Sequence, residues 1–205
     1  MTTSLSVKHD TPHILLVNPW IHDFAAYDFW AKPLGLLTLA SILRRHGFNI
    51  TYLDCLDRFH EKAFQTDPYA RYGRGPYLKT KIPKPGGLED IPRNFSRYGI
   101  KENWFREDLL CMQKPDLVLM SSMMTYWYTG VQETIRVIKA IFPDVPIILG
   151  GIYASLCHEH ALNGSGAHRI QTGPGEKHIL KLVGEHTGFS VNPAFNPDDL
   201  DTYPY

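Results

Sequence analysis

Several features that would assign this sequence to a class at once are missing. None of the apolar runs in its 205 residues approaches the roughly 18–20 residues that a membrane-spanning helix needs. The first dozen residues are polar and lack the apolar core of a signal peptide. Lys plus Arg and Asp plus Glu are both 21, so the zero net charge gives no reason to expect nucleic acid or a membrane surface as a partner. The three cysteines, Cys55, Cys111 and Cys157, are too widely spaced for a disulfide framework or a zinc site. They suit a reducing compartment, and we expect a cytoplasmic protein.

Common catalytic motifs are missing as well. The sequence has neither a phosphate loop that ends in Gly-Lys-Ser/Thr nor a Gly-x-Ser-x-Gly nucleophile elbow. Gly173-Pro-Gly-Glu-Lys-His178 begins like a dinucleotide fingerprint, but it has His178 where the third glycine belongs. His158 and His160 are two residues apart and would not share a helix face, which argues against a metal site there. We therefore name no catalytic residue.

What the sequence does contain is an alternation of short apolar runs and amphipathic segments. The apolar runs predict strands at 13–19, 49–55, 116–121, 145–149 and 168–172. Helical spacing of apolar residues predicts helices at 34–46, 105–113, 131–142, 153–161 and 175–185. Because strand, helix and strand follow one another, the crossovers should be right-handed and the strands parallel. We predict an α/β fold with a doubly wound, five-stranded parallel sheet of the flavodoxin-like (Rossmann-like) order 2-1-3-4-5.

The alternation is interrupted by a long insertion at about 57–104. This segment holds ten Lys or Arg and six Asp or Glu and is rich in aromatic residues, Gly and Pro. Its aromatic content favours an ordered lid or docking surface over a mobile decoration. We expect one domain at 1–188, followed by a polar, proline-rich linker without a core pattern at 189–205.

Four loops should meet at the carboxyl edge of such a sheet, where ligands bind. They are 18–32, 121–128, 150–153 and 172–176. The hydroxyls of Ser121, Ser122 and Thr125 suit a polar tail or a phosphate, although they could equally cap the helix that follows. Gly150 and Gly151 would let a bulky ligand approach the backbone, although they could equally form only a tight turn.

The last of these loops, Thr172-Gly-Pro-Gly-Glu176, brings two more glycines, Gly173 and Gly175, to the start of a helix. A helix N-terminus suits an anion or the polar edge of a ligand. Glu176 is better explained by the helix dipole than by catalysis.

Seven sequence segments follow one another from the N-terminus: Ile14-Leu-Leu-Val-Asn-Pro19, Pro33-Leu-Gly-Leu-Leu37, Leu43-Arg-Arg-His-Gly47, Leu53-Asp-Cys55, Pro115-Asp-Leu-Val118 with Ser121-Ser122, Pro146-Ile-Ile-Leu-Gly-Gly151 and Thr172-Gly-Pro-Gly-Glu176. In this order they resemble the N-terminal cobalamin-binding domain of radical SAM enzymes. Asp198-Asp-Leu-Asp201 with Tyr203-Pro204 resembles the linker into the radical SAM barrel.

The resemblance implies that cobalamin lies on the carboxyl edge, with its nucleotide tail in a slot beside the strands. By position, the following residues would contact the cofactor: Ser121, Ser122 and Thr125 on the tail, Gly150, Gly151 and Tyr153 where the tail passes, Thr172, Gly173, Gly175 and Glu176 on the far side, and Trp20 and Phe24 under the corrin ring.

Two departures from the family limit what this chain can do. Better-known cobalamin modules coordinate cobalt through Asp-x-His-x-x-Gly, but alignment on His22 puts Trp20 and Ala25 at the other two positions. We therefore expect no metal ligand from the protein. The Cys-x-x-x-Cys-x-x-Cys motif of the iron–sulfur cluster is also absent. The resemblance thus places the cluster, S-adenosylmethionine and the catalysis in a C-terminal radical SAM domain of the same polypeptide, which would be the partner of a non-catalytic module.

The leading hypothesis is a cobalamin-binding module of a radical SAM enzyme that performs methyl transfer or related radical chemistry. The alternative is a stand-alone flavodoxin-like module that binds a nucleotide or serves signalling or interaction. A receiver would need an acidic cluster where Met120-Ser-Ser122 stands, and Asn18-Pro-Trp-Ile-His22 is a poor flavin phosphate loop. The aromatic insertion is the main argument for an interaction domain.

Overall fold

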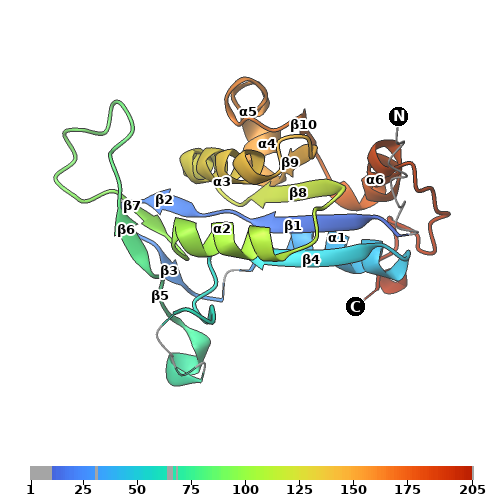
Figure 1. Ribbon diagram of the computed structural model, residues 1–205, viewed down its shortest axis with the longest axis horizontal. Helices are drawn as coiled ribbons and strands as arrows, with labels where there is room; N and C mark the ends of the chain where they lie inside the picture. The colour runs from blue at the N-terminus through green and yellow to red at the C-terminus, as the bar shows by residue number, and fades with distance from the viewer. Residues whose placement is uncertain (1–10, 31, 64–66, 68, 205) are drawn as a thin grey trace, which may run out of the picture.

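The protein is built around one five-stranded parallel sheet (Figure 1). The computed structural model describes residues 11–30, 32–63, 67 and 69–204. The strands of this sheet are β4 (Asn49–Asp54), β1 (His13–Asn18), β8 (Leu117–Ser122), β9 (Ile147–Gly150) and β10 (Arg169–Ile170), in that spatial order. Numbered along the chain, this is the order 2-1-3-4-5, so the predicted fold class is confirmed.

The centre of the sheet is apolar because both of its faces are covered. All six residues of β1 are buried, and β1 pairs with β4 from His13↔Asn49 and with β8 from Ile14↔Leu117. Consecutive side chains of a strand point to opposite faces. Leu15 and Val17 therefore belong to one apolar cluster, and Ile14 and Leu16 to another.

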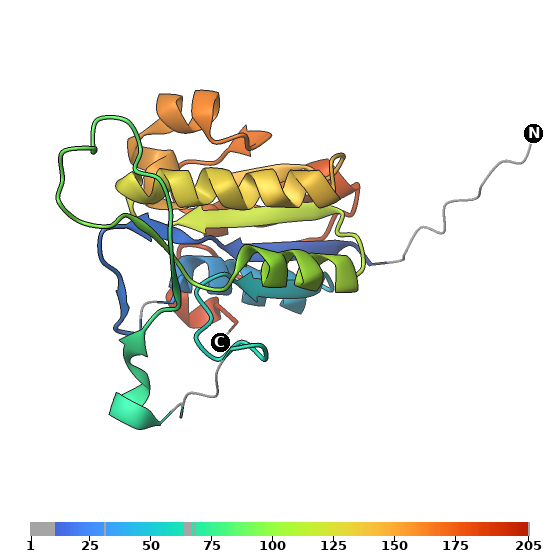
Figure 2. The ribbon, with the colours of Figure 1, turned by 60° about the vertical axis from the view of Figure 1, so that its left-hand side comes forward.

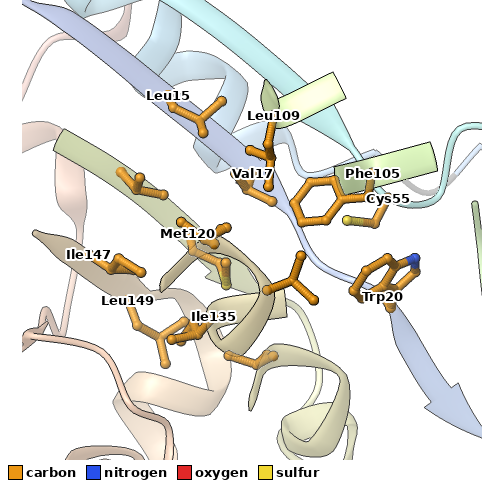
Figure 3. Close-up of a cluster of buried hydrophobic side chains, with 14 of the residues drawn as sticks. Leu15, Val17, Trp20, Cys55, Phe105, Leu109, Met120, Ile135, Ile147 and Leu149 are labelled. Carbon is orange, nitrogen blue, oxygen red and sulfur yellow. The ribbon is translucent and has the colours of Figure 1, made fainter. Parts of the chain in front are cut away.

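Helices pack on both faces, as the alternation predicts. One face carries α2 (Glu102–Cys111), α3 (Tyr128–Ile141), α4 (Gly151–Leu156) and α5 (His158–Gly164); the other carries α1 (Leu34–Arg45) and α6 (Ile179–Thr187). Figure 3 shows the cluster on the α2/α3 face, where Leu109 and Ile135 pack against Val17 and Met120. Among the described residues, no helix is both long enough and apolar enough to cross a bilayer.

Two predicted helices are divided in the structure. The predicted helix at 153–161 is α4 and α5, separated at Cys157, whose φ of −123° and ψ of 46° are not helical. The predicted helix at 175–185 begins as a 3₁₀ turn, Gly175–Lys177, before α6.

The insertion is joined to the loop after β1 by short antiparallel strands. Their bounds are β2 (Ile21–Asp23), β3 (Tyr27–Asp28), β5 (Gly75–Pro76), β6 (Lys79–Lys81) and β7 (Ser96–Tyr98), with a 3₁₀ helix at Ala70–Gly73. They form a three-stranded sheet β2-β7-β6 and a two-stranded sheet β3-β5. Strands of two or three residues have too few positions to show a periodic pattern, so the sequence did not reveal them. In Figures 1 and 2 this unit extends the molecule beyond the carboxyl end of β1.

The segment after α6 also packs on the domain. It includes a 3₁₀ turn at Leu200–Thr202. Phe195 is 9% exposed and joins the apolar cluster on the α1/α6 face. The Ser41 hydroxyl of α1 donates a hydrogen bond to the carbonyl of Pro204 at 2.8 Å. The sequence of this stretch shows no core pattern, because Phe195 is a single aromatic residue in an otherwise polar segment.

Candidate functional site

A cavity opens at the carboxyl ends of β8 and β9, on the face of the sheet that carries α1 and α6. Its volume is about 220 Å³. Its walls come from α1, from β8 and β9, and from the loop before α6, and the residues are Gly35, Leu36, Leu39, Leu119, Met120, Ser121, Ile148, Gly150, Gly151, Gln171, Gly173, Pro174, Gly175, Glu176, Ile179 and Leu182. Apolar side chains line its depth, and polar groups gather at the edge of the sheet.

Strand alternation decides which predicted residues face this cavity. Leu119 and Ile148 belong to the apolar cluster on the α1/α6 face. Ser121 and Gly150 each follow one of them by two positions and therefore point to the same face. No hydrogen bond to the Ser121 hydroxyl is found within the described part of the chain, so this group is free to bond a ligand.

The two glycines where β9 ends and α4 begins, Gly150 and Gly151, have different roles. A Cβ added to Gly150 would lie 3.6 Å from the Gln171 carbonyl oxygen and 4.0 Å from that of Met120, which are ordinary contact distances, so a Cβ fits there. Gly151 has a φ of +88°, and a Cβ on it would lie 2.6 Å from the Ser122 carbonyl oxygen. Gly151 is therefore needed by the turn itself, whereas Gly150 keeps the cavity open.

The loop before α6 forms the mouth of the cavity. Gly173, Gly175 and Glu176 line it, as their position in the sequence suggested. A Cβ on Gly175 would lie 3.1 Å from Cδ1 of Leu39, so the loop approaches α1 closely. Thr172 is exposed and is not among the lining residues.

Three other predicted residues lie away from the cavity. Ser122 points to the opposite face, and its hydroxyl donates to the Met124 carbonyl at 3.0 Å. Thr125 stands in a 3₁₀ turn, Thr125–Trp127, and does not line the cavity. Tyr153 is 1% exposed in the core of the α2/α3 face, with its hydroxyl 2.7 Å from Nδ1 of His160. Burial raises the pKa of Tyr153 to about 12. The structure therefore gives Ser122 and Tyr153 structural contacts and no path to the cavity.

Trp20 and Phe24 do not form a floor at the sheet edge. Trp20 is 1% exposed and packs edge-on against Phe105 at 5.1 Å between ring centroids (Figure 3). Its indole N–H donates to the Ile100 carbonyl at 2.8 Å. Phe24 packs edge-on against Phe95 in the insertion, with 5.1 Å between ring centroids. The structure thus places the Trp20 ring in the core of the α2/α3 face, with no exposed ring face at the edge of the sheet.

His22 lies inside a network of charged groups rather than at an open ligand position. It is 5% exposed, with Nδ1 3.1 Å from the Thr129 hydroxyl and Nε2 2.9 Å from Oε2 of Glu133. Burial by itself would raise the pKa of Glu133, but His22, Arg97 and Arg136 outweigh it and hold that pKa below its ordinary value. Arg97 donates to Oε1 of Glu133 at 2.9 Å. Both imidazole nitrogens thus already face protein oxygens. Nor do the described residues contain a cluster of three or more metal-ligating side chains.

Sequence reasoning missed the apolar half of the site. Leu39 of α1 and Ile179 of α6 belong to no motif, and Leu36 stands in Pro33-Leu-Gly-Leu-Leu37 without having suggested a role in the site. The polar residue Gln171 was missed as well. Strand alternation counted back from Ser121 and Gly150 would have found Leu119 and Ile148. The helical residues could be assigned only after the sheet order was known.

The cavity lies largely within the part of the chain that matches a known family. Residues 107–183 match the family model described as the B12 binding domain. The predicted resemblance to cobalamin-binding domains is confirmed. The matched segment contains β8, β9, β10 and the loop before α6, and thus Ser121, Gly150 and Gly175, but neither α1 nor the insertion.

A relative and a solved structure are also similar to the chain. Cytidylyl-2-hydroxyethylphosphonate methyltransferase from Streptomyces wedmorensis is 23% identical over 186 residues, which are 87% of this chain and 29% of that protein. The chain thus spans less than a third of this relative's length. A structure described as a novel cobalamin-binding protein from Desulfitobacterium hafniense DCB-2 is 12% identical in sequence, with a TM-score of 0.45. The aligned region covers 85% of this chain and 58% of the chain in that structure.

Proposed function

We propose that this chain binds cobalamin and places the nucleotide tail of the cofactor in the cavity beside β8 and β9. The observation that carries this proposal is an apolar cavity at the carboxyl edge of a sheet, walled by the segment that matches the B12-binding family. Ser121 would donate a hydrogen bond to the tail, and Gly150 would leave room for it. Gly173, Gly175 and Glu176 would close the mouth.

The residues present fit part of the cofactor rather than all of it. Pockets that enclose whole small ligands measure roughly 300–1,000 Å³, and this cavity measures about 220 Å³. Cobalamin is larger than such ligands, so one arm would enter while the corrin ring stays at the open edge. Exposed apolar side chains close to that edge in sequence, Met124 at 39% and Ile152 at 49%, suit a broad ring. Bound cobalamin would supply a cobalt centre able to carry a methyl group.

We further propose that the chain works together with a C-terminal radical SAM domain of the same polypeptide. That domain would hold S-adenosylmethionine and an iron–sulfur cluster and would perform the catalysis. This is supported by the resemblance of the segment around Asp198 and Tyr203 to the linker of that family and by the methyltransferase relative, of which the chain spans only 29%. The three cysteines are free thiols, which agrees with a cytoplasmic location.

The test is a titration of the purified chain with hydroxocobalamin, followed by the absorption bands of the cofactor. We expect saturable binding, and no binding of FMN or NAD in parallel titrations. Absence of any spectral change at high micromolar cobalamin would refute the proposal.

A substitution at Gly150 tests whether cobalamin binds in the cavity or elsewhere on the surface. Gly150→Val should fold, because a Cβ fits there, but its methyl groups should fill the cavity and abolish cobalamin binding. Gly86→Val is the matched control, because Gly86 lies in the insertion and, among the described residues, no atom outside its chain neighbours comes within 4 Å of an added Cβ. Wild-type affinity in Gly150→Val would show that the tail lies elsewhere.

A further inference from the structure

The insertion contains a second concave site that shares no lining residue with the cobalamin cavity. It is a groove of about 650 Å³ beside β6 and β7, at the base of the loop that joins these two strands. That loop projects from the body of the protein (Figures 1 and 2). We propose that this groove binds the phosphate group of a small organic anion.

Four cationic side chains surround the groove. Lys79 and Lys81 are two residues apart on β6 and so point to the same face. Lys84 and Arg93 come from the two ends of the connecting loop. Among the described residues, none of the four has a carboxylate partner, and no Asp or Glu lines the groove. The Lys84 amine only donates to the backbone carbonyls of Glu89 and Ile91.

The floor of the groove offers a buried hydrogen-bond donor. Ser96 is 5% exposed and stands directly opposite Lys81 in the β6–β7 ladder, so both side chains point to one face. Its hydroxyl has no hydrogen-bond partner within the described residues. The nearest carboxylate in the ladder, that of Asp23, accepts hydrogen bonds from the Phe24 amide and the Trp127 indole instead. A hydroxyl without a protein partner beside cations is suited to donate to an anionic oxygen.

The composition and size of the groove define the class of ligand. Several ammonium and guanidinium donors with no competing carboxylate favour a doubly charged phosphate over a carboxylate. Orthophosphate alone would leave most of the volume empty, and the groove falls within the range of roughly 300–1,000 Å³ of small-molecule sites. Phe24 and Phe95 add an apolar wall for an organic group. Because the cations surround one groove instead of following a stripe across the surface, a small ligand is favoured over a nucleic-acid strand.

Calorimetric titration of the whole chain with inorganic pyrophosphate at low ionic strength tests the site, since salt would screen these exposed charges. We expect saturable binding that weakens by about tenfold or more in Lys81→Glu, where an attractive charge becomes repulsive. Ser96→Ala should weaken it by about threefold, the effect of one lost hydrogen bond. Lys114→Glu is the matched control, because Lys114 is exposed, has no ion pair among the described residues and lies outside the groove.

Thermal unfolding of each variant shows whether the fold is intact, and because it needs no cobalamin it keeps this test separate from the first proposal. Three results would overturn the assignment: no pyrophosphate binding, equal losses in Lys81→Glu and Lys114→Glu, or tighter binding of a ten-nucleotide single-stranded DNA than of pyrophosphate. The last result would mean that the surface recognises nucleic acid.

Discussion

The two faces of the sheet differ most at its carboxyl edge. On the α1/α6 face, small and apolar residues leave a cavity between β8, β9 and the two helices. On the α2/α3 face, Trp20 and the charged group of His22, Arg97 and Glu133 fill the corresponding space, and the insertion contributes Arg97 through β7. The same parallel sheet thus presents one open and one closed side. The closed side is the one to which the insertion is attached.

The largest expected effect comes from the turn that both faces share. Gly151→Val should destabilise the protein by roughly 3 kcal/mol or more, because it combines left-handed backbone strain with a clash against the Ser122 carbonyl. Thermal unfolding in the absence of cobalamin measures the loss. Gly150→Val is the paired variant and should unfold close to the wild type. Equal stability of the two variants would mean that the turn tolerates side chains at both positions.

The closed face should depend on Arg97. Arg97→Met removes the guanidinium that lies 2.9 Å from Glu133 and 4.9 Å from the Trp20 ring centroid, and should cost about 3 kcal/mol in urea unfolding. Arg106→Met is the control, because Arg106 pairs with Glu102 at 2.9 Å but is 35% exposed, so the loss should stay below about 1 kcal/mol. Similar losses in both variants would contradict a special role for the buried pair.

The charged network also predicts how stability depends on pH. Because the pKa of Glu133 is held below its ordinary value of 4.5, folding favours the ionised carboxylate. This contribution is present above pH 4.5 and is lost as the pH falls through the folded-state pKa. Glu133→Gln should therefore show a weaker loss of stability on acidification than the wild type. An unchanged acid profile would assign the acid sensitivity to other carboxylates.

A smaller effect is expected from Tyr153, which the sequence suggested for the cofactor site. Tyr153→Phe removes the hydroxyl that lies 2.7 Å from His160 and should cost about 1 kcal/mol. Cobalamin affinity should stay the same, because Tyr153 lies on the face opposite the cavity. Unfolding and titration of the same sample separate the two readouts. A large loss of affinity without loss of stability would return Tyr153 to the site.

The smallest expected effect is on the spectrum of the bound cofactor. His22→Ala should leave the visible bands of bound cobalamin unchanged, because both ring nitrogens of His22 face protein oxygens. The paramagnetic cobalt(II) spectrum gives the decisive readout. The readout is nitrogen superhyperfine splitting, measured after the cofactor's own base has been removed. If splitting from one nitrogen persists in the wild type and disappears in His22→Ala, this histidine is a cobalt ligand.

The comparison of the two faces also shows what the sequence could predict. Apolar runs and crossover helices were enough for the strand order, because β1, β4 and β8 are long and buried. Proximity in sequence was not enough for the site. Ser121 and Gly150 face the cavity, whereas Ser122 faces the opposite side.

Other features of the molecule depend on contacts that no local pattern encodes. Trp20 is buried by Phe105 and Ile100, which follow it by about eighty residues or more. The strands of the insertion are two or three residues long, and they exist only through pairing: β7 with β2 and β6, and β5 with β3. Such partners cannot be inferred from periodicity.

The packing of residues 190–204 has a thermodynamic consequence for the cavity. Phe195 shares one apolar cluster with Leu36, which lines the cavity, and Lys177, next to the cavity mouth, pairs with Asp198. If a ligand in the cavity orders α1 and the cavity mouth, it also stabilises the docked position of this segment, and the coupling free energy is the same in both directions. The reverse also applies: a pull that lifts the segment from α1 would weaken the hold on the ligand. The docking of residues 190–204 on α1 and the occupancy of the cavity are therefore coupled, so that a change in either one shifts the equilibrium of the other.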